Sequence, residues 1–134
     1  MKRLCTALFS ILLILSLIGC AKKLPEQYDE ETLLNAALTT IELANARDYE
    51  AITDLIREDL YTDSLVDQIE EGWGPLLAKA GAYKEYTQYQ TTASTSQDGY
   101  EYAVIAIVCE YENDSLIYTL GFDEDYKLVS LYMK

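Results

Sequence analysis

The sequence predicts an α+β domain in which N-terminal helices pack on a curved, four-stranded antiparallel sheet. Before Gly81 the apolar residues recur every three or four positions, as they do along one face of a helix. After Gly81 the chain becomes rich in tyrosine, threonine, valine and isoleucine, and turn-forming residues interrupt it at regular intervals. Because each helix has a single apolar stripe that needs a partner, we expect the helices to cover one face of the sheet.

Two amphipathic helices are predicted between Glu26 and Tyr61. The apolar stripe loses its phase near residues 45–49, which predicts the joint between them. Pro25 suits the start of the first helix, because the amide that proline lacks would be unpaired there in any case. The sequence therefore predicts a helical pair ahead of a third helix.

The third helix is predicted to begin after Thr62 or Asp63, whose side-chain oxygens can accept hydrogen bonds from first-turn amides. Two glycines and a proline in residues 72–75 predict a kink or a short break, since proline removes an amide donor and clashes with the preceding turn. Gly81 is expected to end the helical half. Trp73 is in phase with the apolar stripe, so we expect its ring to be buried against the sheet.

Four strands, joined as successive hairpins, fit between the turn signals. In the second strand, alternation places Ala103, Ile105 and Ile107 on one face and Tyr100 and Tyr102 on the other. Both faces contain further apolar residues, which is typical of a central strand. We expect the aliphatic face to meet the helices and the tyrosine face to open outward. The predicted strands span Tyr83–Ala93, Tyr100–Tyr111, Ser115–Phe122 and Tyr126–Tyr132.

The N-terminal segment has the three parts of a secretory signal: the basic pair Lys2-Arg3, an apolar stretch and a cleavage motif. The motif Leu17, Ile18, Gly19 and Cys20 resembles the lipobox of bacterial lipoproteins, in which the cysteine becomes the acylated N-terminus. An uncleaved anchor is the alternative, but a spanning helix needs about 20 apolar residues, and this run is shorter. The sequence therefore predicts a signal peptide over residues 1–19, a lipidated cysteine with a short tether over residues 20–25, and a single domain over residues 26–134.

The predicted location is extracytoplasmic, with Cys20 held in the bacterial cell membrane by acyl chains such as palmitate. The chain has 23 acidic and 10 basic residues, for a net charge of −13. Because such a surface repels phosphate backbones, it argues against nucleic acid as a partner. Cys109 would be the one cysteine left in the domain, so the domain must be stabilised by apolar packing, without an internal disulfide.

The chain has no histidine, which excludes a Ser-His-Asp or Cys-His relay. What remains is carboxylate and phenol chemistry, for which Glu101, Glu110 and Asp123 with Tyr102 and Tyr118 are the candidate strand residues. Turns and exposed faces explain the same carboxylates more simply. The acidic run at residues 123–125 lacks the spacing of a calcium loop. The sequence therefore identifies no catalytic residue, no metal site and no cofactor.

Tyrosine is the most unusual feature of the composition, with 12 in the chain. Its apolar ring and polar tip suit half-exposed faces and binding surfaces. Pairing between neighbouring strands on a solvated sheet is the alternative explanation. We take Tyr100, Tyr102 and Tyr118 as the candidate binding face.

One further pattern spans both halves of the chain: Trp73, Leu77, Gly81, Tyr83, Lys84, Gly121-Phe122-Asp123 and residues 127–131. This pattern resembles the family known as domain of unknown function 3887. The similarity covers about residues 33–133, and the resemblance implies a nuclear-transport-factor-2-like, or cystatin-like, cone found in bacterial surface lipoproteins. It implies no catalytic residues. A glycine turn would be more usual in this pattern at Asp125-Tyr126.

Two functions remain open from the sequence. The first is a non-catalytic module at the cell envelope that binds an envelope protein or a small ligand. The second is a small enzyme of the ketosteroid-isomerase type that uses a carboxylate and tyrosines. The sequence is also compatible with a homodimer. A deep cavity with a carboxylate at its base would favour the enzyme.

Overall fold

The computed structural model of the chain describes residues 23–134. Within this range, three α-helices and one 3-10 turn precede four strands, and the strands form one antiparallel sheet in the order β1-β2-β3-β4. The predicted α+β class is therefore confirmed. The elements are α2 (Glu30–Asn45), α3 (Tyr49–Asp54), η1 (Glu58–Leu60), α4 (Leu65–Ala80), β1 (Tyr83–Thr95), β2 (Glu101–Tyr111), β3 (Ser115–Phe122) and β4 (Leu128–Met133).

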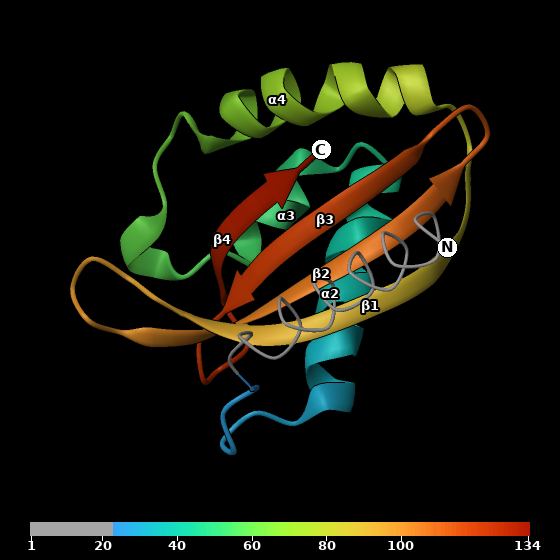
Figure 1. Cartoon of the computed structure of the whole chain (residues 1–134). Helices are drawn as coiled ribbons and strands as arrows, with labels where there is room; N and C mark the ends of the chain where they lie inside the picture. Colours follow the sequence, from blue (N-terminus) through green and yellow to red (C-terminus); the bar gives the residue numbers. More distant parts are fainter. Residues whose placement is uncertain (1–22) are drawn as a thin grey trace, which may run out of the picture.

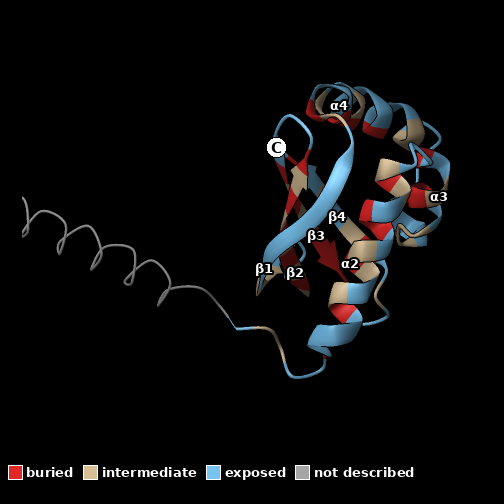
Figure 2. Cartoon of the chain, turned by 90° about the vertical axis from the view of Figure 1, so that its right-hand side faces the viewer, coloured by how far each residue is buried: buried red, intermediate tan, exposed pale blue. Residues whose placement is uncertain are grey.

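The sheet is curved, and its concave face is covered by helices (Figure 1). In the side view, α2 and α3 form a layer opposite the sheet, and α4 lies across the top of both (Figure 2). In β2 the aliphatic residues Ala103, Ile105 and Ile107 are fully buried. This confirms that the aliphatic face of β2 meets the helices. The same strand lies between β1 and β3, as its two apolar faces predict.

The first helix begins later than predicted. Pro25 lies in a turn, where its carbonyl accepts a hydrogen bond from the Tyr28 amide at 3.1 Å. Helix α2 starts at Glu30, because Asp29 caps it by accepting a hydrogen bond from the Thr32 amide at 2.9 Å. An aspartate at this position satisfies an otherwise unpaired amide of the first turn, so it is a stronger start signal than the proline.

Helix α4 corrects two predictions. Its N-cap residue is Ser64 rather than Thr62 or Asp63, and Ser64 makes no side-chain capping hydrogen bond. The Thr62 carbonyl instead closes a turn with the Leu65 amide at 3.2 Å. The predicted break is also absent, since α4 continues through Pro75 to Ala80.

The continuity of α4 has a packing explanation. Pro75 is exposed, and the carbonyl of Glu71, which it leaves unpaired, lies on an exposed residue, where water can bond to it. The opposite face of the helix is buried at Ile69, Trp73 and Leu77, which holds both halves of the helix against the core. Gly81 ends the helix with a φ of 85°, as predicted.

The strand boundaries agree with the predicted ones to within two residues. Gly99 has a φ of 82° in the turn between β1 and β2. In the turn before β4, Tyr126 has a φ of 59°, in the left-handed region where glycine is favoured. Its side chain offsets that cost, because the hydroxyl accepts a hydrogen bond from the Asp29 amide at 2.8 Å and the ring packs edge-on against Tyr28.

Candidate functional site

An apolar groove runs between the first half of α4 and the edge strand β4, and we call it the α4–β4 groove. Its volume is about 380 Å³, within the range of about 300–1,000 Å³ that is usual for ligand pockets. Apart from Gln68 and Ser130, the lining side chains are apolar or glycine. The lining residues are Ile56, Leu60, Leu65, Gln68, Ile69, Gly72, Trp73, Leu128, Val129, Ser130 and Leu131.

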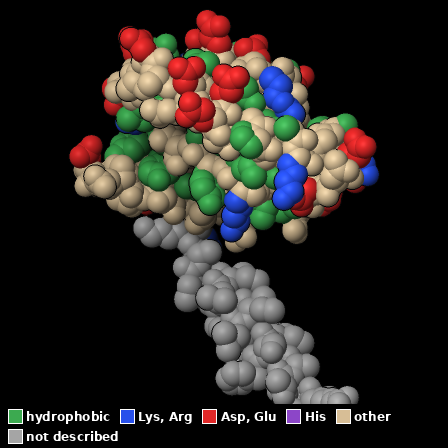
Figure 3. Space-filling model, turned by 90° about the horizontal axis from the view of Figure 1, so that it is seen from above, with side chains coloured by type: hydrophobic (Ala, Val, Ile, Leu, Met, Phe, Trp, Pro, Cys, Tyr) green, Lys and Arg blue, Asp and Glu red, His purple; other side chains and the backbone are tan. Residues whose placement is uncertain are grey.

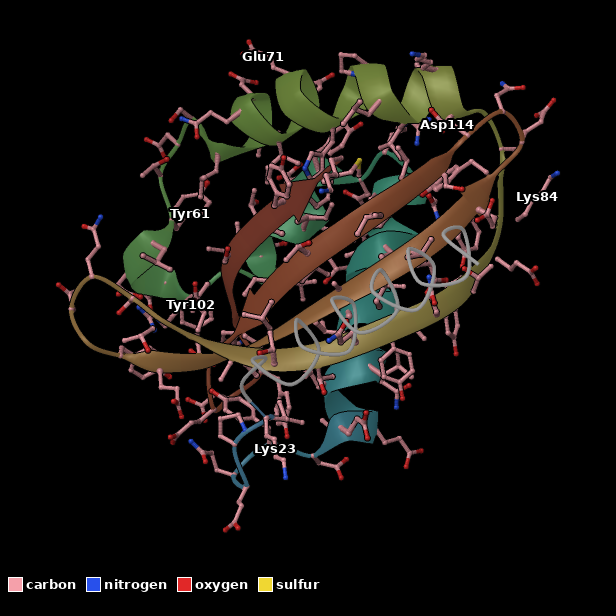
Figure 4. The ribbon with its side chains drawn as sticks, viewed as in Figure 1. Lys23, Tyr61, Glu71, Lys84, Tyr102 and Asp114 are labelled. Atoms are coloured by element: carbon pink, nitrogen blue, oxygen red, sulfur yellow. The ribbon has the colours of Figure 1, made fainter. Side chains whose placement is uncertain are left out.

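The helical wall of the groove follows from the spacing of its residues. Positions 65, 68, 69, 72 and 73 fall on one face of α4. The groove is open in front of Gly72, where an added Cβ would meet no atom within 4 Å. At the mouth of the groove, Leu60 and Tyr61 are 40% and 47% exposed. In Figure 4, Tyr61 lies beside the opening between α4 and β4, whereas Glu71 points away from the sheet.

On the strand wall, only some of the main-chain N–H and C=O groups along the outer edge of β4 are paired. Leu128 pairs with Ile56 in a short parallel bridge. The Leu128 amide donates to the Leu55 carbonyl, and the Arg57 amide donates to the Leu128 carbonyl, both at 2.9 Å. After Arg57 the chain turns away into η1. Beyond Leu128, the outer edge of β4 therefore borders the groove rather than another strand.

Acidic residues lie at the η1 side of the groove and on the outer face of α4. Helix η1 exposes Glu58 and Asp59 just before Leu60, and Asp59 forms an ion pair with Arg57 at 2.6 Å. The exposed carboxylates of α4 lie on the side of the helix turned away from the lining residues. Seen from above, acidic side chains gather next to exposed hydrophobic ones, with Lys and Arg side chains toward the right (Figure 3). An apolar groove on a chain of net charge −13 favours ligands that are both apolar and cationic.

The three tyrosines of the predicted binding face do not lie together. Tyr100 is 37% exposed, and the Arg57 guanidinium lies over its ring, 5.4 Å from the centroid. Tyr102 is half-buried on the face of the sheet that points away from the helices. Tyr118 is fully buried, so its placement on an exposed face was wrong. Its position among Leu116, Leu120 and Phe122, which share its face of β3 by alternation, is the sequence signal that indicates burial.

Tyr118 lies in the core between two aromatic residues. Trp73 is 6% exposed and packs edge-on against Tyr118, with ring centroids 5.6 Å apart. This confirms that Trp73 is buried between α4 and the sheet. The Tyr118 hydroxyl lies 2.6 Å from that of Tyr111, which in turn donates to the Asn45 side-chain oxygen. These two hydrogen bonds join α2 to β2 and β3.

None of the candidate carboxylates lines the groove. Glu101 is exposed, and Glu110 accepts a hydrogen bond from the Ser115 hydroxyl at 2.8 Å. Asp123 is buried, but its Oδ1 accepts hydrogen bonds from the Asp125 and Lys127 amides, both at 2.9 Å, and so shapes the turn before β4. The groove thus has the surface to bind an apolar group and carries no acid or base on its walls.

Burial of the phenols predicts a loss of stability at alkaline pH. Burial raises the pKa of Tyr111 to about 12, and burial with the Tyr111 hydrogen bond raises the pKa of Tyr118. Burial likewise raises the pKa of the Cys109 thiol to about 12. Unfolded tyrosines ionise near pH 10, so the unfolded chain loses protons first. We expect the free energy of unfolding to hold up to about pH 9 and to fall between about pH 10 and 12.

Urea unfolding at a series of pH values measures this loss directly. Tyr118→Phe is the matched variant, because it keeps the ring and removes one ionising hydroxyl. Its stability should be lower at neutral pH but should fall less steeply with pH. A wild-type free energy of unfolding that stays constant through this pH range would contradict the prediction.

The comparisons with known proteins place the chain in a family. The sequence profile described as a protein of unknown function (DUF3887) matches residues 37–131. The chain belongs to this family. The match covers α4 and residues 128–131 of β4, so all the lining residues of the groove are part of the DUF3887 domain. No curated protein matches the chain.

A solved structure shares the fold of the chain. The DUF3887 domain is similar to the NMR structure of a protein from Ruminococcus gnavus, with 31% sequence identity and a TM-score of 0.69. The similarity covers 84% of this chain and 96% of that one. The fold is therefore shared over nearly the whole length of the neighbour.

Sequence reasoning missed the groove. Gly72 was interpreted only as a residue that weakens a helix, and Leu60, Leu65 and Leu131 were assigned to no site. The available signal was the helical spacing that puts Gly72 beside Leu65 and Ile69. The predicted signal peptide, Leu17, Ile18, Gly19 and Cys20 lie outside the residues that the structure describes.

Proposed function

We propose that this chain is an extracytoplasmic lipoprotein whose DUF3887 domain is a non-catalytic binding module. The observation that carries the proposal is the open α4–β4 groove, which is apolar, accessible and without a carboxylate on its walls. Contiguous exposed apolar surface in a soluble domain usually marks an interaction site. The isomerase-type alternative has no comparable support, because none of its candidate carboxylates lines the groove: Glu101 is exposed, Glu110 is hydrogen-bonded to Ser115, and Asp123 shapes a turn.

Anchoring at the membrane is the second part of the proposal, and the motif at residues 17–20 supports it. Within residues 23–134, none of the helices combines the length and the apolarity needed to cross a bilayer. Acyl chains on Cys20 would hold the domain at the surface through buried methylenes, at about 0.8 kcal/mol each. The groove would then be presented outside the cytoplasmic membrane.

The anchor is tested by Cys20→Ser in cells that process lipoproteins. We expect this variant to lose both the acyl mass and cleavage before residue 20, because both steps need the thiol-modified cysteine. Intact-mass spectrometry of the membrane fraction measures both. Cys109→Ser is the matched control, since Cys109 is buried in the sheet and should leave processing unchanged. A Cys20→Ser chain with wild-type processing would overturn the anchoring proposal.

The groove is tested by filling it from Gly72. Leucine at this position projects into the groove and improves helix propensity by up to about 1 kcal/mol, so the protein should stay folded. The probe is a small hydrocarbon bearing a photoreactive diazirine, added to the full-length chain in a non-ionic detergent. Adducts are located by peptide mass spectrometry.

We expect wild-type protein to acquire adducts on the lining residues of α4 and β4, and Gly72→Leu to lose most of them. Gly72→Ala is the control, because one methyl group raises helix propensity but leaves the groove open. Labelling that is equal in the leucine and alanine variants, or absent from the groove in wild type, would show that the groove does not bind apolar molecules.

A further inference from the structure

We infer that the α4–β4 groove binds an extended peptide segment, apolar at alternate residues and basic between them, which adds as a strand to the free edge of β4. This inference rests on the proposed function and names the ligand class of the same site. It rests on three features: an open strand edge, an apolar cleft beside it and the net negative charge of the chain.

The protein itself shows that the edge of β4 accepts another strand. The segment from Leu55 to Arg57 makes two main-chain hydrogen bonds to Leu128, in the pattern of a parallel strand. This pairing ends after one residue, because the chain turns into η1 at Glu58. The segment thus takes the position of a fifth strand at Leu128 only, and the rest of that position, along the groove, is free.

The pairing of β4 with β3 shows which main-chain N–H and C=O groups of β4 can bind an added strand. Lys134 and Ile117 exchange two hydrogen bonds, at 2.8 and 3.1 Å. Since bonded and non-bonded pairs alternate in an antiparallel ladder, Tyr132 and Ser130 also bond to β3. The N–H and C=O of Leu131 therefore point away from β3, toward the side of the groove. An added strand would satisfy these groups, which is how sheet-edge recognition provides affinity.

The cleft supplies selectivity for side chains. Helix α4 packs against α3 and β3, and the space in front of Gly72 is open. Alternate side chains of a strand point to the same face. Those on the inner face of an added strand would enter a space lined by Leu60, Leu65 and Ile69. Apolar residues at every second position fit this environment.

The negative charge of the chain determines which residues are favoured between the apolar ones of the added strand. Side chains on the outer face of the added strand would stay in solvent, in the field of a chain with net charge −13. The exposed carboxylates of η1, Glu58 and Asp59, directly precede Leu60 of the groove, and acidic side chains are frequent on the face of the molecule shown in Figure 3. Lysine or arginine at these positions gains from that field, and glutamate is repelled. The same repulsion disfavours a second copy of this acidic chain as the occupant.

The test uses a fluorescein-labelled nonapeptide of alternating valine and lysine and the full-length protein in a non-ionic detergent, with binding followed by fluorescence anisotropy. We expect saturable binding. Methylation of the amides on one edge of the peptide should raise Kd by roughly tenfold, because the carbonyls of β4 then lack their donors. Glutamate in place of lysine should abolish binding. Gly72→Leu should weaken binding of the parent peptide, while Gly72→Ala should not.

The outcomes separate this inference from the proposed function. Equal Kd values for the methylated and parent peptides would overturn strand addition. Diazirine labelling of the groove that the peptide fails to block would also overturn the peptide as occupant, while the apolar binding site would stand. Loss of both labelling and peptide binding would remove the proposed function as well. Binding of the parent peptide that Gly72→Leu leaves unchanged would place the peptide elsewhere and refute the inference.

Discussion

Replacing Trp73 with alanine is expected to lower the free energy of unfolding by about 3–5 kcal/mol, the usual cost of truncating a buried aromatic residue. The ring is 6% exposed and joins α4 to the sheet through its edge-on contact with Tyr118. Its removal leaves a cavity where α4 meets β3. Such a loss is a large share of the roughly 5–15 kcal/mol that stabilises a typical domain.

Chemical unfolding followed by circular dichroism measures this effect. Glu71→Ala is the control, because Glu71 lies on the same helix and points away from the sheet (Figure 4). It should change stability by no more than about 0.5 kcal/mol. Trp73→Phe should fall between the two, since it keeps an aromatic ring. A Trp73→Ala protein as stable as Glu71→Ala would mean that the indole contributes little to the core.

Replacing Gly81 with alanine is expected to have the second largest effect. Gly81 has φ 85° and ψ −148°, a backbone region that is almost restricted to glycine and costs other residues about 1–3 kcal/mol. A Cβ there would also lie 2.9 Å from the Asn113 side-chain nitrogen and 3.1 Å from the Glu112 Cβ. Both neighbours are held in place, because the Glu112 and Asn113 amides donate to the carbonyls of Ala82 and Ala80 at 2.8 Å.

The variant Gly99→Ala distinguishes the backbone strain of the Gly81 substitution from its steric conflict. Gly99 also has a positive φ, of 82°, but a Cβ there would meet nothing within 4 Å. Alanine at position 99 therefore adds backbone strain alone, whereas alanine at position 81 adds strain and a steric conflict. The free energies of unfolding of the two variants should differ, with Gly81→Ala the less stable. Equal losses would show that the β2–β3 turn can move away at little cost.

Much of the fold can be predicted from the sequence because its signals are local. The helical spacing before Gly81 and the alternation after it predict the order of elements, and the apolar residues on both faces of β2 predict its central place. Gly81 is a predicted end of the helical half, because glycine readily adopts the positive φ that such a turn requires. The burial of Trp73 follows from its phase on α4. Tyr118 could have been assigned to the core in the same way, from its aliphatic neighbours on β3.

Tertiary packing decided what the local signals could not. Pro75 remains inside α4 because the buried face of the helix, at Ile69, Trp73 and Leu77, holds both of its halves against the core. The α4–β4 groove is formed by segments about 60 residues apart, and it borders a free edge of β4 because η1 carries the chain away from that strand. The sequence by itself determined the elements and their apolar faces. The distance between those faces depends on long-range packing, which no local pattern encodes, so only the tertiary structure could show that a groove is left between them.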